Sequence, residues 1–199
     1  MTAPHIDRDS PGSPAARAWV YVAACAGEDI AKIGFSRDPL QRLQSLHPRW
    51  FEFFDGADGF VVRADSVRDA RRIERELITA AAAHRAAAPL TVSARAGGHT
   101  EWFRGAVALL GAAADRLAAE GFAVIRPLQP WLGARLRERA GGVYEWSLHA
   151  LRAIDAGDPV ARRELRDALD ALAAFDIEVA DCVDVDVLRV WRDIVRAGV

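Results

Sequence analysis

The stretch Trp19-Val20-Tyr21-Val22 and the later stretch Ile30-Ala31-Lys32-Ile33-Gly34-Phe35 predict the β-hairpin on which the fold depends. Both segments are rich in β-branched and aromatic residues, which is typical of strands. The run Ala26-Gly27-Glu28-Asp29 between them has the composition of a turn. We therefore expect two short antiparallel strands, the second of which ends near a glycine.

The sequence directly after the hairpin predicts a short helix, Pro39–Leu46. Asp38 is suited to cap its first turn, and proline is favoured at the first helical position. This helix carries Arg42. The phenol of Tyr21, the ammonium group of Lys32 and the guanidinium group of Arg42 are therefore expected near one end of the hairpin.

The next elements extend this unit. Phe60-Val61-Val62 predicts a third strand, and Ser66 with Asp69 resembles a capping box before a helix from about Val67 to Ala87. An alanine-rich helix is expected over residues 105–119, and residues 121–125 are suited to an edge strand. The expected fold is α+β, with a small three-stranded antiparallel sheet flanked by helices.

The chain changes character after Pro127. Four segments have helical patterns, and residues 176–186 alternate as a strand does. The sequence thus predicts a loose N-terminal tail over residues 1–16, an α+β domain over residues 17–120 and an α-helical C-terminal region over residues 127–199. The four helical segments are 131–139, 143–156, 159–175 and 187–197.

Composition narrows the class of protein. With 51% hydrophobic and 27% charged residues, a chain of 199 residues can form one domain and a smaller appendage. The net charge of −2 does not indicate a nucleic-acid partner, so a DNA contact must depend on a local basic patch.

Cys25 and Cys182 lack the spacing of a zinc site and predict a reduced, cytoplasmic protein. No apolar run approaches the ~18 residues of a membrane span, so no membrane partner is expected.

Five segments in the order of a known motif set resemble the GIY-YIG endonuclease superfamily, and most of all its phage and meiotically up-regulated gene 113 branch. Trp19-Val20-Tyr21 stands at the Gly-Ile-Tyr position, and Lys32-Ile33-Gly34 stands at the Tyr-Ile-Gly position. Arg42 is similar to the helix arginine of that family. The run from Asp69 to Leu77 resembles the helix that carries the metal-binding glutamate, and Thr100-Glu101-Trp102-Phe103 resembles the closing segment.

The resemblance implies a metal-dependent endonuclease that hydrolyses DNA phosphodiester bonds. It assigns Glu74 as the ligand of one Mg²⁺ or Mn²⁺ ion, because hard cations prefer oxygen ligands and a single carboxylate with waters and a phosphate suffices. Glu76 is the alternative ligand, and Glu74 is otherwise expected to pair with Arg71 or Arg75 on the helix surface.

The other implied catalytic residues are Tyr21, Lys32, Arg42 and His47. Tyr21 is expected to act as general base or to orient water, with a neighbouring Lys32 lowering its pKa or contacting phosphate directly. The fork of Arg42 suits a bidentate phosphate contact. His47 is suited to protonate the leaving group, although a histidine beside a proline is more often structural.

Two features leave a second function open. The chain contains no asparagine, which some members of that superfamily use near the end of the domain, and His99, Thr100 or Glu101 are the candidates to replace it. The arginines between residues 63 and 75 can form a phosphate-binding face or can pair with nearby carboxylates. The alternative is a catalytically inactive module that binds nucleic acid or a protein partner. The oligomeric state stays open, with a dimer through the C-terminal helices as one option.

Overall fold

The computed structural model describes residues 17–93 and 96–198 of the chain. Its centre is a six-stranded sheet in the order β4-β5-β2-β1-β3-β6, in which every neighbouring pair is antiparallel. The expected α+β class is confirmed, but the expected number of three strands is wrong. The strands are β1 (Ala18–Cys25), β2 (Ile30–Ser36), β3 (Phe54–Ala64), β4 (Arg85–Ala86), β5 (Trp102–Arg104) and β6 (Ala123–Ile125).

The three strands predicted from the sequence are the middle of this sheet, and the additional strands are short edge segments. β5 pairs with residues 30–32 of β2 on one side and with β4 on the other, and β6 pairs with residues 61–63 of β3. Segments of two or three residues are too short to show a strand periodicity, so their pairing depends on tertiary contacts. The last residues of β2, 33–36, extend beyond the part of the strand that pairs with β5.

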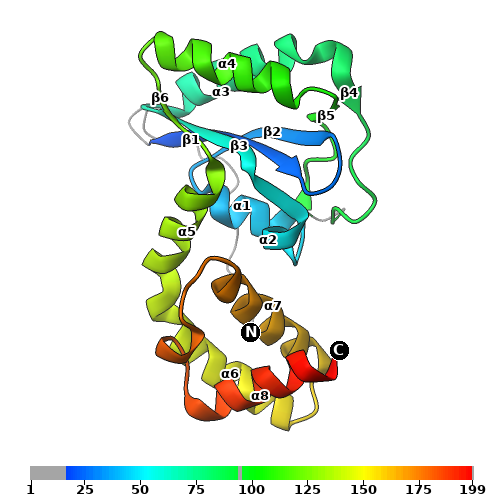
Figure 1. Cartoon of the computed structure of the whole chain (residues 1–199), viewed down its shortest axis with the longest axis vertical. Coiled ribbons are helices and arrows are strands. Elements are labelled where there is room, and N and C mark those ends of the chain that lie inside the picture. Colours follow the sequence, from blue (N-terminus) through cyan, green and yellow to red (C-terminus); the bar gives the residue numbers. More distant parts are fainter. Residues whose placement is uncertain (1–16, 94–95, 199) are drawn as a thin grey trace.

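Helices cover both faces of the sheet, as Figure 1 shows. On one face lie α1 (Pro39–Leu46) and α2 (Trp50–Phe53), and on the other lie α3 (Val67–Ala80) and α4 (Val107–Ala119). Successive residues of β1 therefore join different cores. Tyr21 packs with α1, whereas Val20 and Val22 pack with α3 and α4.

The predicted helix caps form as expected. The backbone N–H of Gln41 donates to Asp38 Oδ1 at 3.1 Å, and the N–H of Asp69 donates to Ser66 Oγ at 3.1 Å. The predicted boundaries of α1 are confirmed. α3 is shorter than predicted, because the chain turns after Ala80 into a 3-10 helix and then into β4.

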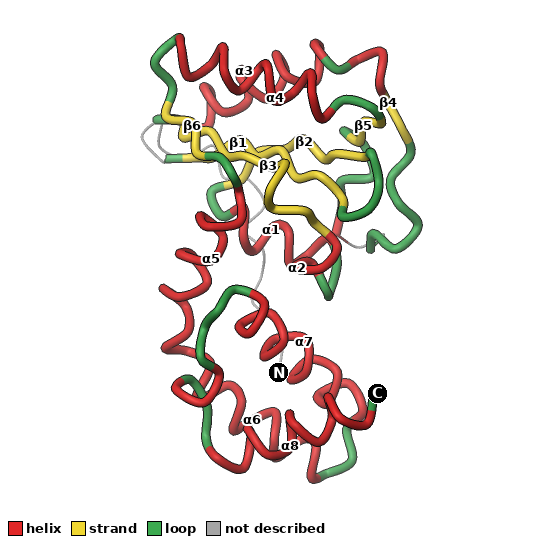
Figure 2. The backbone as a smooth tube through the Cα atoms, viewed as in Figure 1, coloured by secondary structure: helices red, strands yellow, loops and turns green. Residues whose placement is uncertain are grey.

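The C-terminal region is helical, as Figure 2 shows by its almost complete red colour. α5 (Leu128–Arg139) packs against β3 and leads into a small bundle of α6 (Val143–Asp155), α7 (Pro159–Ala174) and α8 (Val185–Ala197). The strand-like interpretation of residues 176–186 is wrong, because this segment holds a 3-10 turn and the start of α8, with Asp184 as N-cap.

Two further expectations concern the ends and the environment of the chain. The predicted loose tail, residues 1–16, lies outside the described residues. Within residues 17–93 and 96–198, no helix has both the length and the apolar character that a membrane crossing requires.

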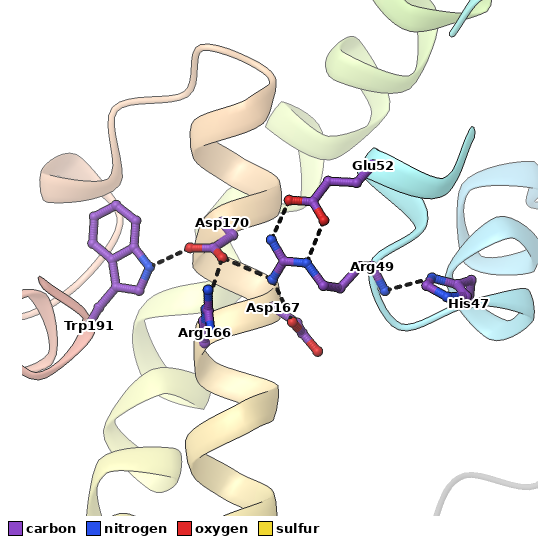
Figure 3. Close-up of polar contacts among 7 residues, drawn as sticks. All are labelled: His47, Arg49, Glu52, Arg166, Asp167, Asp170 and Trp191. Atoms are coloured by element: carbon purple, nitrogen blue, oxygen red, sulfur yellow. Dashed lines mark hydrogen bonds and ion pairs between the residues drawn. The ribbon is translucent and has the colours of Figure 1, made fainter. Parts of the chain in front are cut away.

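The connection between the sheet and the helical bundle includes a cluster of charges, shown in Figure 3. Arg49, in the turn between α1 and α2, donates to Glu52 Oε2 at 2.6 Å, to Asp167 Oδ1 at 2.8 Å and to Asp170 Oδ2 at 3.0 Å. Trp191 of α8 donates from Nε1 to Asp170 Oδ1 at 2.9 Å. One guanidinium group thus joins the first helices of the chain to α7, and an indole joins α7 to α8.

Candidate active site

The site begins with Tyr21, which is opposite Gly34 in the β1–β2 pair. The phenol lies directly over this glycine, because a Cβ atom at position 34 would be 2.5 Å from the Tyr21 hydroxyl oxygen and 2.6 Å from Cζ. A side chain at position 34 is therefore excluded while the ring keeps its place. The hydroxyl is held at the end of β2 that extends past β5.

Arg42 of α1 reaches the same place. It lowers the pKa of the Tyr21 phenol through its charge and a hydrogen bond, but burial outweighs this effect and raises that pKa to about 12. The expectation that Lys32 would lower the pKa of Tyr21 is not met, because Arg42 is the cation that acts on the phenol. Tyr21 is therefore a neutral phenol at neutral pH, suited to donating and accepting hydrogen bonds.

Lys32 is almost completely enclosed, with 2% of its surface exposed. Its Nζ donates to the carbonyl oxygens of Ile33 at 2.7 Å and Thr100 at 3.2 Å, and to Glu101 Oε2 at 3.0 Å. Burial lowers the pKa of the ammonium group, and the hydrogen bond and charge of Glu101 oppose this shift. The carboxylate therefore supports a charged lysine inside the protein.

Glu74 approaches from α3, on the opposite face of the sheet. Its half-buried carboxylate accepts a backbone hydrogen bond from Phe35, in the part of β2 that extends beyond β5. Burial raises the pKa of the Glu74 carboxyl, the negative charge of Glu101 raises it further, and Lys32 opposes both. The hydrogen bond with Phe35 puts the Glu74 carboxylate at the edge of β2, within electrostatic reach of Lys32 and Glu101.

The edge of β2 explains how residues from two faces meet. The N–H of Ile33 donates to the Glu101 carbonyl oxygen at 3.0 Å, and two residues later the N–H of Phe35 donates to Glu74. Alternate residues of a strand direct their N–H groups to the same edge. Glu101 and Glu74 thus follow each other along this edge.

Glu76, the alternative ligand, has a different environment. Its side chain is 51% exposed and pairs with Arg72 at 2.9 Å, one turn away on α3. Arg75 Nε donates to the Arg71 carbonyl oxygen, so Glu76, Arg72 and Arg75 make the contacts of a solvated helix surface. Arg71 differs, because its guanidinium group lies over the Phe35 ring of β2 and its charge lowers the pKa of Glu74.

The contacts of His47 do not join it to Tyr21, Lys32, Arg42 or Glu74. It is the C-cap of α1, and its Nδ1 accepts from the Arg49 N–H at 3.2 Å, as Figure 3 shows. Its ring stacks on Phe53 with centroids 4.4 Å apart. Both contacts stabilise the turn between α1 and α2, so the structure gives His47 a structural role.

Glu101 also belongs to the site. The sequence suggests it only as one of three candidates to replace the missing asparagine. It is the partner of Lys32, and its backbone is in the left-handed region with φ 59°. Such a conformation is uncommon for glutamate and is often found at functional sites. Burial raises the pKa of its carboxyl, but the hydrogen bonds from Thr100 and Lys32 outweigh this and lower it.

The donor set can be compared with what a divalent cation requires. Among residues 17–93 and 96–198, no group of three or more His, Cys, Asp or Glu side chains could hold a metal ion. Mg²⁺ commonly keeps several waters and binds through one or two carboxylates together with substrate phosphate. The half-buried carboxylate of Glu74 fits this mode of binding, in which one carboxylate, waters and a substrate phosphate hold the ion. The described residues do not form a site in which protein ligands alone surround a metal ion.

Comparison with known proteins gives one match. The T5orf172 domain matches residues 18–118, just over half of the 199-residue chain. No curated protein and no solved structure matches the chain. The predicted membership of the GIY-YIG superfamily is wrong, because the matching family is a different one. The motifs behind that prediction are short and are separated by unrelated sequence, so they do not distinguish between nuclease-like families.

The matched region contains Tyr21, Lys32, Arg42, Glu74 and Glu101, and it ends within α4. The α-helical bundle lies outside it. The chain belongs to the T5orf172 domain family, which is a nuclease-like, DNA-binding domain family.

Proposed function

We propose that this protein is a metal-dependent endonuclease that hydrolyses phosphodiester bonds in DNA. The observation that carries the proposal is the grouping of Tyr21, Lys32, Arg42 and Glu74 around β2, although they come from two strands and two helices. A phenol can orient water, cations can stabilise the charge on the phosphate oxygens, and a carboxylate can hold a divalent ion, and phosphodiester hydrolysis uses such groups. Because both cysteines are free thiols, we place its action in the cytoplasm.

The side chains have separate tasks in this proposal. Arg42 binds the scissile phosphate and stabilises the charge that develops on its oxygens. Tyr21, as a neutral phenol, orients the attacking water, because a group with a pKa of about 12 is a poor base at neutral pH. Glu74 holds one Mg²⁺ or Mn²⁺ ion, which when bound lowers the pKa of a coordinated water and polarises the phosphate.

A DNA-binding module without cleavage activity is the second candidate. The arrangement of Lys32 favours it, because all three N–H donors of the ammonium group already have acceptors within the protein. The raised pKa of Tyr21 favours it as well. A dimer through the C-terminal helices has no support from the family match, which ends before these helices begin.

Incubation with linear, nicked and branched DNA in the presence of Mg²⁺ or Mn²⁺ tests the proposal. We expect cleavage by the wild type and a loss of about 100-fold or more for Glu74→Gln and for Arg42→Ala. Glu76→Gln is the matched control, because it makes the same chemical change on the exposed face of α3. Cleavage that survives both site substitutions contradicts the assigned site, and DNA binding without cleavage by the wild type supports the second candidate.

A further inference from the structure

The two cations of the site share one source of acceptors. Arg42 donates from Nη1 to the Ala96 carbonyl oxygen and from Nη2 to the Gly97 carbonyl oxygen at 2.8 Å. Lys32 donates to the Thr100 carbonyl oxygen and to the Glu101 carboxylate. Four oxygen acceptors therefore come from the six residues 96–101, which we name the cover segment.

The cover segment is in close contact with both cations. A Cβ atom at Gly98 would be 2.5 Å from Arg42 Nη2 and 3.6 Å from Lys32 Cε. The two side chains therefore both lie close to one backbone position. Their acceptors are oxygen atoms, as are the acceptors that a phosphate group presents to Arg and Lys. The segment thus occupies the donors that a phosphodiester would need.

Lys32 leaves no donor for a further ligand. An ammonium group has three N–H bonds, and Ile33, Thr100 and Glu101 accept all three. With 2% of the residue exposed, a phosphate can reach Nζ only after Thr100 and Glu101 have moved. Contact between Lys32 and DNA therefore requires a second conformation of the cover segment.

The backbone of the cover segment is suited to such a change. Gly97 and Gly98 have φ values of 58° and 99°, and Glu101 has φ 59°, so three of its six residues are in the left-handed region. Gly97 is exposed. Most of the contacts that hold the segment are polar. Besides the bonds from Arg42 and Lys32, Trp102 Nε1 donates to the Gly98 carbonyl oxygen at 2.8 Å, and Ile33 donates to the Glu101 carbonyl oxygen. At its start, the Ala96 N–H donates to the Ser93 carbonyl oxygen and Ala96 packs against the hydrophobic core.

We propose that the cover segment is an internal competitor for the phosphate-binding donors Lys32 and Arg42: it occupies them in the free protein and gives them up when a DNA backbone phosphate binds. This rests on the proposed function, since it assumes that DNA is the ligand. The affinity for DNA then depends on the fraction of molecules in which the segment has moved away.

Gly97→Ala tests the competitor without removing a polar group. A Cβ atom at position 97 meets nothing within 4 Å, but alanine disfavours φ 58°, so the substitution destabilises the covered conformation alone. Gly157→Ala is the matched control, because Gly157 has φ 86° in equally open space between α6 and α7. The measurement is the Kd for a fluorescent DNA duplex in EDTA, which prevents cleavage. We expect Gly97→Ala to bind about fivefold more tightly than the control.

A second measurement does not depend on DNA. Lys32 is the only lysine in the chain, so its acylation by an amine-reactive ester can be followed by mass spectrometry with the N-terminal amine as internal reference. We expect slow acylation in the wild type and in Gly157→Ala, and acylation about fivefold faster in Gly97→Ala. Glu101→Gln should also accelerate it, because a neutral amide holds the ammonium group less strongly.

The two measurements separate the possible failures. Equal acylation rates in Gly97→Ala and its control overturn the competitor, whatever the DNA result. Faster acylation together with an unchanged or weaker DNA affinity shows that the segment covers Lys32 but overturns its competition with DNA. If Gly97→Ala is acylated faster but neither it, its control nor the wild type binds DNA, the proposed function is overturned and the covering of Lys32 stands.

Discussion

At the scale of single residues, the place of the Tyr21 hydroxyl depends on the absence of a side chain opposite it. The phenol is 1% exposed, and its ring packs across Gly34 in the neighbouring strand. Burial of the ring and the contact with Arg42 fix the hydroxyl, and the same burial keeps it protonated. The glycine is therefore part of the site although it carries no functional group.

Gly34→Ala should displace the phenol. The new Cβ atom would be 2.5 Å from the hydroxyl oxygen, so either the ring or the strand has to move. We expect the free energy of unfolding to fall by about 1–3 kcal/mol, as for overpacked cores, and DNA cleavage to fall with it. Urea denaturation measures the first effect. Gly141→Ala is the control, because a Cβ atom at that position has nothing within 4 Å, and it should leave the free energy of unfolding almost unchanged. Equal effects of the two substitutions would contradict the packing argument.

The pH dependence of cleavage should report the carboxyl of Glu74. Its pKa is raised by burial and by Glu101, and a protonated carboxyl does not bind a divalent cation, so kcat/KM should fall as the pH drops through this raised pKa. The loss should thus begin at a higher pH than for an ordinary glutamate. Glu101→Gln removes one cause of the shift and should move the acid limb to lower pH, whereas Glu76→Gln should leave it in place. An acid limb that does not move in Glu101→Gln would exclude the coupling between the two carboxyls.

At the scale of elements, the position of Glu74 depends on α3, and the N-terminus of α3 depends on Ser66. Ser66 accepts from the Asp69 N–H and donates to Asp69 Oδ2. Ser66→Ala should lower the free energy of unfolding by about 1 kcal/mol. Thr79→Ala is the control within the same helix. Its hydroxyl only donates to the Arg75 carbonyl oxygen, so its loss should change the stability by a few tenths of a kcal/mol at most. Similar midpoints in urea for the two variants would contradict the capping role.

The elements that were predictable from the sequence are those with local signals. The hairpin has β-branched strands around a polar turn, and α1 has an acidic cap followed by proline. β6 lies within residues 121–125, which the sequence suits to an edge strand, but β4 and β5 have two or three residues each and pair with partners far away in the chain, so no periodicity marks them. The strand prediction for residues 176–186 is wrong because Val179 and Val183 are buried four positions apart around a turn. In so short a segment, apolar residues spaced in this way resemble the alternation of a strand.

The candidate site was predictable to a similar extent. Tyr21, Lys32, Arg42 and Glu74 were expected near one another, and their contacts and electrostatic couplings place them at one edge of the sheet. The role of Glu101 could not be predicted, because its pairing with Lys32 spans 69 positions and requires a left-handed backbone at a glutamate. The cation that acts on Tyr21 was also missed, since the Lys32 ammonium group pairs with Glu101 and Arg42 is the cation that contacts the phenol.

At the scale of the whole molecule, the sheet and the helical bundle are joined through Arg49. The side chain of Arg49 is 26% exposed, and its guanidinium group faces two carboxylates of α7, Asp167 and Asp170, as well as Glu52 of its own segment (Figure 3). These carboxylates raise the pKa of Arg49 above its usual range, led by the hydrogen bond to Glu52. The matched family domain ends before α5, so this contact connects the family domain to a region that the family match does not cover.

Arg49→Ala should therefore destabilise the whole chain more than the loss of an exposed ion pair does. Without the guanidinium group, Asp167 and Asp170 lie close together with less compensation for their charge, and the half-buried position limits screening by water. We expect the free energy of unfolding to fall by about 1–3 kcal/mol, an effect between those of exposed and buried pairs.

Arg126→Ala is the control, since its pair with Asp115 is half exposed or more on both sides and should contribute less than about 1 kcal/mol. Urea denaturation at low and high salt measures both variants. A larger loss for Arg49→Ala that persists at high salt supports the coupling of the two regions, whereas equal losses that disappear with salt would show that the cluster acts only as surface charge.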